Sequence, residues 1–182
     1  MFSDFCAFVF FRPDPAMHAC FTTLILTFIA LACAASRQPM ADCVVQRVSD
    51  GDSFRCQDGS RVRLIGIDSP ERQQHPFGEQ AAQALLQMMP PGTTVKLESD
   101  AAPTDRYGRL LAHVWVGSIL VNEAMVQGGW AVLYTVPPNV KYAERLEEAQ
   151  KEARMLGAGL WGKSGFACPP ADFRRGKCVS SP

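Results

Sequence analysis

Residues 61–71, with the sequence RVRLIGIDSPE, constrain the fold most, because they predict a strand that ends in a rigid turn. Pro70 fixes its own φ angle and favours an extended conformation for Ser69. The carboxylates of Asp68 and Glu71 are therefore held in place rather than free to move. Two adjacent carboxylates repel each other, so a pair at a strand end indicates a bound metal or a raised pKa.

The same predicted strand carries a charged residue, Arg63. If the strand alternates regularly, Arg63 lies on the face of Ile65 and Ile67 and points toward the interior of the sheet. A charge in that position is costly unless it is paired. We therefore expect Arg63 to have a ligand or a carboxylate partner.

The rest of the chain predicts a small α+β domain. Strands are expected at residues 43–48, 53–56, 61–67, 94–98 and 110–116, and helices at 78–89, 121–127 and 142–156. The helices have apolar residues at helical spacing and end at proline or glycine, whereas the strands are short and bounded by turn residues. Five short strands interrupted by about three α-helices predict a five-stranded OB-fold β-barrel.

Residues 1–35 contain an apolar stretch that ends in small residues, which is typical of a secretory signal peptide. Met17 is a possible true start, because starting there removes two aspartates from the charged region. A retained membrane anchor is the alternative, since the stretch is near the lower limit of about 17 residues for a spanning helix. A loose lipoprotein-type cleavage site ends at Cys33. We expect a secreted or periplasmic protein in which 36–42 is a linker, with membrane attachment only if the segment stays uncleaved or is lipidated.

Four cysteines remain beyond this segment, namely Cys43, Cys56, Cys168 and Cys178. An even number is typical of disulfides formed in an oxidising compartment. Three pairings are possible. Cys43 and Cys56 would face each other across a hairpin, and Cys168 and Cys178 would close a short loop, so we favour that pairing. Zinc is the alternative, but there is no CxxC motif and no histidine has ligand spacing.

Net charge does not indicate a partner. The formal net charge of the whole chain is zero, and removal of residues 1–35 changes it only to +1. A strongly basic nucleic-acid-binding surface is therefore not expected, and any site for a polyanion must be a local cluster.

Three short motifs could form such a cluster, and each has a simpler interpretation. DGDS at 50–53 is a hairpin turn that could place Asp52 on a hard cation. DSPE at 68–71 is either a solvated loop or a metal site. DRYGR at 105–109 is either a basic hairpin tip or a loop that presents Arg109 to phosphate oxygens, which a guanidinium binds two at a time.

Taken together, the motifs resemble the staphylococcal nuclease (thermonuclease) family. The resemblance runs from about Val44 to Trp161, so we expect 43–163 to be a nuclease-like domain and 164–182 a tail tied by a disulfide. It depends on five blocks in order: DGDS at 50–53, RLIGIDSPE at 63–71, DRYGR at 105–109, VNEA at 121–124 followed by Gly129, and GLW at 159–161. Members have an OB-fold and hydrolyse phosphodiester bonds of DNA and RNA with calcium, leaving 3′-phosphates.

The resemblance implies a role for each motif residue. The carboxylates of Asp52 and Asp68 and the backbone carbonyl of Ser69 would bind Ca²⁺. Glu71 would orient or deprotonate the attacking water. Arg63 and Arg109 would neutralise the charge that develops on the phosphate, which is commonly the largest contribution to catalysis.

The resemblance also implies substrate contacts. Arg106 and Tyr107 match positions that touch a substrate phosphate. Only Tyr134 is available to stack on a base, because Val136 occupies the position of a second aromatic residue. Stacking contributes about 1–3 kcal/mol per base, so we expect a weaker hold on the nucleotide. The expected partners are DNA and RNA, with single strands preferred, and the chain is expected to be a monomer.

Two other functions fit parts of the sequence. A non-catalytic OB-fold module could bind nucleic acid without cleaving it, although this chain keeps every residue of the catalytic set. An envelope-anchored structural domain is the second alternative, in which the apolar N-terminus would be the main functional element.

Overall fold

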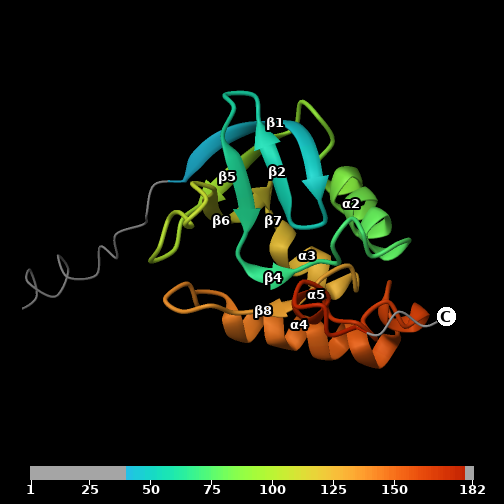
Figure 1. The fold of residues 1–182 in the computed structure, drawn as a ribbon. Helices are drawn as coiled ribbons and strands as arrows, with labels where there is room; N and C mark the ends of the chain where they lie inside the picture. Colours follow the sequence, from blue (N-terminus) through green and yellow to red (C-terminus); the bar gives the residue numbers. More distant parts are fainter. Residues whose placement is uncertain (1–39, 179–182) are drawn as a thin grey trace, which may run out of the picture. The chain divides into compact units, whose positions relative to one another are not determined.

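The computed structural model describes residues 40–178. Five strands form the main sheet and close it into a barrel (Figure 1): β1 (Ala41–Asp50), β2 (Ser53–Cys56), β3 (Arg61–Leu64), β5 (Thr94–Glu98) and β6 (Leu110–Val116). Their order is β3-β2-β1-β5-β6, and a parallel pairing between β3 and β6 completes the circle. The predicted five-stranded OB-fold barrel of an α+β chain is confirmed. The predicted signal or anchor segment lies outside the described residues, as does most of the predicted linker.

Three short strands and the helices surround this barrel. β7 (Ile119–Leu120) extends the sheet beside β6, while β4 (Gly66–Asp68) and β8 (Val132–Tyr134) form a separate two-stranded sheet. The helices are α2 (Phe77–Met88), α3 (Val121–Gln127), α4 (Ala143–Leu156) and the one-turn α5 (Pro170–Phe173), with a 3₁₀ helix at Trp161–Lys163. Figure 1 shows α2 beside β1 and β2, and α4 along the β4–β8 sheet. No helix within residues 40–178 is both long and apolar enough to cross a membrane.

The core lies inside the barrel and continues under the helices. Alternate residues of the strands point inward, so Val45, Phe54, Val62 and Leu64 are almost completely buried. Leu85 of α2 closes one side of the same cluster. Each fully buried side chain of this size contributes about 1.5–3 kcal/mol relative to an exposed one, so this core holds the surrounding loops in fixed positions.

The strand predicted at residues 61–67 is two strands, and the expectation that Arg63 points into the barrel is wrong. Val62 and Leu64 face the core, so Arg63 lies on the opposite side of β3. The chain turns at Gly66, which has a φ of +80°, and a Cβ there would lie 2.5 Å from Cδ1 of Leu146. Glycine is therefore required at this break, and β4 leaves the barrel to pair with β8.

Both favoured disulfides are present, but the first hairpin has a different register from the expected one. Cys43 is bonded to Cys56, with 5.8 Å between their Cα atoms, and Cys168 is bonded to Cys178. If Cys43 and Cys56 lay directly opposite each other, the centre of the hairpin would lie between Ser49 and Asp50, whereas the turn follows Asp50 and Cys56 lies opposite Val45. Two register shifts each add a residue to β1, so Cys56 lies opposite Val45 rather than Arg47, which is closer to Cys43.

Candidate active site

One cavity of about 520 Å³ lies where the β1–β2 turn, the end of β4, the 105–109 loop and the segment after β8 meet. The predicted metal, catalytic and substrate-binding residues all line it: Asp52, Arg63, Asp68, Ser69, Glu71, Arg106, Tyr107, Arg109 and Tyr134. These residues come from four separate parts of the sequence. The barrel therefore brings together the groups that the sequence motifs singled out.

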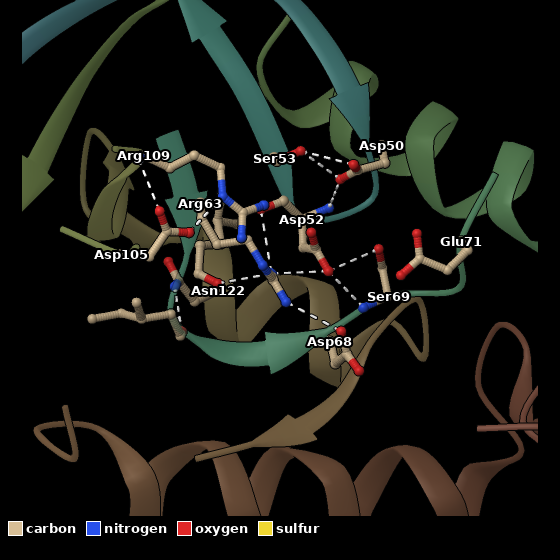
Figure 2. Close-up of polar contacts among 12 residues, drawn as sticks. Asp50, Asp52, Ser53, Arg63, Asp68, Ser69, Glu71, Asp105, Arg109 and Asn122 are labelled. Carbon is tan, nitrogen blue, oxygen red and sulfur yellow. Dashed lines mark hydrogen bonds and ion pairs between the residues drawn. The ribbon is translucent and has the colours of Figure 1, made fainter. Parts of the chain in front are cut away.

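Arg63 lies at the centre of the cavity wall. Its Nη1 atom lies 2.9 Å from Oδ2 of Asp52, and its Nη2 atom lies 3.1 Å from Oδ1 of Asp68. Figure 2 shows one guanidinium that joins both carboxylates, with Glu71 beyond Ser69. Only 13% of the Arg63 side chain is exposed, so its ion pairs are shielded from solvent.

Asp52 is a buried carboxylate in an environment that disfavours its charge. Burial raises its pKa to about 7, and the nearby charge of Asp50 adds to this effect, although Arg63 opposes it. The backbone N–H and the hydroxyl of Ser69 both donate to Oδ2 of Asp52, at 2.8 and 3.1 Å. Asp50 is held in turn by the backbone N–H of Asp52 and the hydroxyl of Ser53.

The donor chemistry of this cluster fits a hard cation. Asp52 and Asp68 are both buried and present carboxylate oxygens, which Ca²⁺ prefers, and a cation would remove the cost of burying the Asp52 charge. Within residues 40–178, no three His, Cys, Asp or Glu side chains are grouped closely enough to form a complete metal cage. A cation here would therefore complete its shell with backbone oxygen and water.

Glu71 is positioned by the loop that precedes α2. Its backbone N–H donates to the side-chain oxygen of Gln74 at 2.9 Å, and its carbonyl accepts from the backbone N–H of Gln74 at 2.8 Å. Gly78 packs so closely that a Cβ there would lie 2.1 Å from the carbonyl oxygen of Glu71. The loop is short and has little freedom, so Glu71 has a defined place at the edge of the cavity.

Arg109 is positioned by its own loop. Its Nε atom lies 2.7 Å from Oδ2 of Asp105, while Oδ1 of Asp105 accepts the backbone N–H groups of Tyr107 and Arg109. Burial alone would raise the pKa of Asp105, but these hydrogen bonds lower it. Arg61 also donates a hydrogen bond to the Tyr107 carbonyl, so β3 holds the same loop.

Exposed aromatic and apolar side chains lie at the rim. Tyr107 is 57% exposed and Tyr134 is 42% exposed, and both line the cavity. The Arg106 guanidinium lies over the Tyr107 ring and donates to its hydroxyl at 2.6 Å. Val136 is 52% exposed and lines the same cavity with an aliphatic side chain.

Comparison with known proteins agrees with this geometry. Residues 61–163 match the family model described as staphylococcal nuclease homologue. The thermonuclease of Staphylococcus hyicus is 38% identical over 125 residues, which cover 64% of this chain and 73% of that protein. The chain belongs to the staphylococcal nuclease family. The thermonuclease of Staphylococcus intermedius is 39% identical over 126 residues, or 65% of this chain and 74% of that protein. Endonuclease YncB of Bacillus subtilis is 30% identical over 141 residues, which cover 72% of this chain and 66% of that protein.

Several residues at the site of this staphylococcal nuclease homologue were not singled out as site residues from the sequence. Asp50 lines the cavity, whereas the DGDS motif predicted only a turn role for it. Asn122 is fully buried and donates to the carbonyl of Ile65, which fixes the break between β3 and β4. A buried asparagine inside an apolar helix is a signal that could have indicated this role.

Arg174 is the least expected member of the site. It reaches the cavity from the C-terminal tail, and no local motif marks it. Its neighbour Arg175 pairs instead with Asp172 of the same tail. Only the path of the tail distinguishes the two arginines, and the path follows from tertiary packing.

Proposed function

We propose that this chain is an exported, calcium-dependent endonuclease that hydrolyses phosphodiester bonds of DNA and RNA and leaves 3′-phosphate ends. The observation that carries the proposal is the single cavity that Arg63 and Arg109 share with the carboxylates of Asp52, Asp68 and Glu71. Membership of the staphylococcal nuclease family, with relatives named thermonuclease and endonuclease, supports the same chemistry.

Asp52 and Asp68 would hold Ca²⁺ through their carboxylates, and Ser69 would add its backbone carbonyl. When bound there, Ca²⁺ would supply positive charge that polarises the phosphate and lowers the pKa of water. The buried carboxylate of Asp52 supports this assignment, because burial raises its pKa to about 7 and a bound cation would favour its charged form.

Glu71 would accept a proton from the attacking water. Its carboxylate lies at the cavity edge, and its backbone is fixed on both sides by Gln74. The hydroxide adds to phosphorus, the bond between phosphorus and O5′ breaks, and O5′ takes a proton from solvent water. The phosphate then remains on O3′ of the upstream fragment, and the downstream fragment begins with a 5′-hydroxyl.

Arg63 and Arg109 would bind the non-bridging phosphate oxygens. A guanidinium matches two such oxygens at once, and its charge opposes the negative charge that grows in the transition state. Arg63 is pre-positioned by Asp52 and Asp68, and Arg109 by Asp105. Neither side chain therefore needs much ordering when substrate binds.

The rim of the cavity supports a preference for single strands. Exposed Tyr134 and Tyr107 can touch a base or a sugar only where the nucleotide is not stacked inside a duplex. Export is supported by the two disulfides, since such bonds persist in oxidising compartments.

The direct test is cleavage of a single-stranded oligonucleotide with Ca²⁺ and again with excess chelator. Glu71→Gln should lower the rate with Ca²⁺ by orders of magnitude, whereas Glu79→Gln, which makes the same change at an exposed site on α2, should not. Arg109→Ala should behave like Glu71→Gln, with Arg47→Ala on the exposed surface of β1 as its control.

Two results would contradict the proposal. Cleavage that persists in chelator would remove the cation from the reaction. Tight binding of the oligonucleotide without any cleavage by the unaltered chain would favour a binding module instead.

A further inference from the structure

The C-terminal tail closes on the site as a small covalent loop. Cys168 and Cys178 are bonded across a separation of 10 residues, and α5 lies inside the loop. The side-chain amide of Gln74 donates to the carbonyl of Cys168 at 3.0 Å. Since Gln74 also holds the backbone of Glu71, the tail is joined to the same loop that carries Glu71.

Arg174 extends from this tail to two acidic residues of the site. Its Nη2 atom lies 2.8 Å from Oδ2 of Asp68, and its Nη1 atom lies 3.0 Å from Oδ1 of the same carboxylate. The Nη1 atom also lies 2.7 Å from Oε1 of Glu71. This is a two-point contact between a guanidinium and a carboxylate, the strongest form of such a pair.

Asp68 is consequently engaged on both oxygens. Oδ1 accepts from Arg63 and Arg174, and Oδ2 accepts from Arg174, while only 1% of the side chain is exposed. A divalent cation at Asp68 would share these oxygens with a second positive charge. The guanidinium of Arg174 and the cation therefore compete for the same carboxylate.

The exposure of the two arginines indicates which one can move away. The Arg174 side chain is 40% exposed, whereas that of Arg63 is 13% exposed. Arg63 also keeps its ion pair with Asp52. Arg174 lies at the edge of the cavity, so its guanidinium can return to water more readily than that of Arg63.

We propose that Arg174 is a positioning residue that neutralises Asp68 and Glu71 before the cation arrives and competes with Ca²⁺ for Asp68. The inference rests on the proposed function, because it needs Asp68 to be a cation ligand. The tail thereby lowers the affinity of the site for Ca²⁺, and cation binding releases the guanidinium from Asp68 and Glu71.

The test is a calorimetric titration of the purified full chain with Ca²⁺ in the absence of nucleic acid. Arg174→Gln should lower the Kd for Ca²⁺ by about tenfold, as expected for the loss of a competing charge-assisted pair. Arg175→Gln is the matched control, since it removes the same charge from the adjacent position and should leave the Kd unchanged. Arg174→Lys keeps the charge without the two-point contact. Its Kd for Ca²⁺ should therefore lie between that of the unaltered chain and that of Arg174→Gln.

A second variant tests the role of the tail itself. Replacement of Cys168 and Cys178 by serine removes the covalent closure that holds Arg174 near Asp68. The Kd for Ca²⁺ should therefore be lower than that of the unaltered chain, as in Arg174→Gln. Thermal denaturation of each variant checks that the barrel remains folded. The barrel keeps its own disulfide between Cys43 and Cys56 in this variant.

The outcomes separate this inference from the proposed function. Ca²⁺ binding by the unaltered chain with an equal or weaker affinity in Arg174→Gln would overturn the competition. Absence of Ca²⁺ binding in both the unaltered chain and Arg174→Gln would overturn the calcium site and the competition together.

Discussion

The guanidinium of Arg63 lies 2.9 Å from the carboxylate of Asp52, although most of both side chains is shielded from solvent. Arg63 lies in β3, and Asp52 lies in the turn between β1 and β2. The fold of these barrel strands therefore sets the separation of the two residues. A shielded ion pair stabilises little by itself, because desolvation offsets much of the attraction. In the proposed function, the pair places Arg63 for a phosphate and Asp52 for a cation before either binds.

The raised pKa of Asp52 predicts that, in the absence of metal, the stability of Asp52→Asn relative to the unaltered chain increases from pH 4 to pH 8. A carboxylate whose pKa is raised from 3.8 to about 7 in the folded state contributes stability below its ordinary value, and this contribution is lost as pH rises to about 7. The melting temperature of the variant minus that of the unaltered chain should therefore be several degrees higher at pH 8 than at pH 4.

Thermal denaturation in chelator measures this gap directly. Asp42→Asn is the control, because it makes the same change at an exposed position on β1. A gap that is equal at both pH values would contradict the effect of burial on Asp52.

We expect a large loss of stability when Asn122 is replaced by alanine. Its side chain accepts from the backbone N–H of Val114 and donates to the carbonyls of Ile65 and Ala112, all in a buried environment. An unsatisfied buried group costs about 1–3 kcal/mol, so Asn122→Ala should lower the free energy of unfolding by about 2–4 kcal/mol. Urea denaturation gives this value, and a change below about 0.5 kcal/mol would show that water replaces the side chain.

We expect replacement of Gly78 to affect activity, although Gly78 does not line the cavity. Alanine normally stabilises a helix by about 0.5–1 kcal/mol relative to glycine. Here the added Cβ would lie 2.1 Å from the carbonyl oxygen of Glu71, so the loop must shift. We expect Gly78→Ala to reduce kcat at least tenfold while the chain stays folded, and Gln83→Ala on the exposed face of α2 to leave kcat unchanged. Equal kcat values in the two variants would contradict this view of the loop.

We expect a gain of substrate affinity when Val136 is replaced by tyrosine. It lies exposed at the cavity rim near Tyr134, where a second aromatic ring could stack on a base. Val136→Tyr should improve oligonucleotide binding by about 1–3 kcal/mol. Val140→Tyr places the same ring on an exposed residue outside the cavity and should have no effect, so equal affinities in the two variants would argue against a base at Val136.

Local sequence determined several features of the site. Pro70 limits the chain between Asp68 and Glu71, and Asp105 pairs with Arg109 only four positions away. Hydrophobic alternation was sufficient to predict the barrel strands, because most of them have one face in the core. Strand parity predicted the wrong face for Arg63, although Gly66 inside a predicted strand is a recognised sign of a bend.

Long-range contacts could not be predicted in this way. Arg174 and Asp68 are 106 positions apart, and no periodicity or motif relates them. Their contact depends on where the tail packs after the last long helix. The Cys168–Cys178 disulfide and the hydrogen bond from Gln74 to Cys168 hold the tail in that place. Such contacts require the folded chain, because they follow from packing between distant segments.

In the proposed reaction, Glu71 and Arg109 come from distant segments and act on the same phosphodiester bond. Cleavage rates of Glu71→Gln, Arg109→Ala and the double variant, measured at saturating Ca²⁺, test whether they do. Each single variant should lose about 10²–10³-fold or more in rate, and the double variant should lose much less than the product, because residues that act on one transition state are strongly non-additive. Two results would show that the two residues do not act on one transition state. One is an unchanged rate in either single variant, and the other is a double variant whose fold loss equals the product of the two single losses.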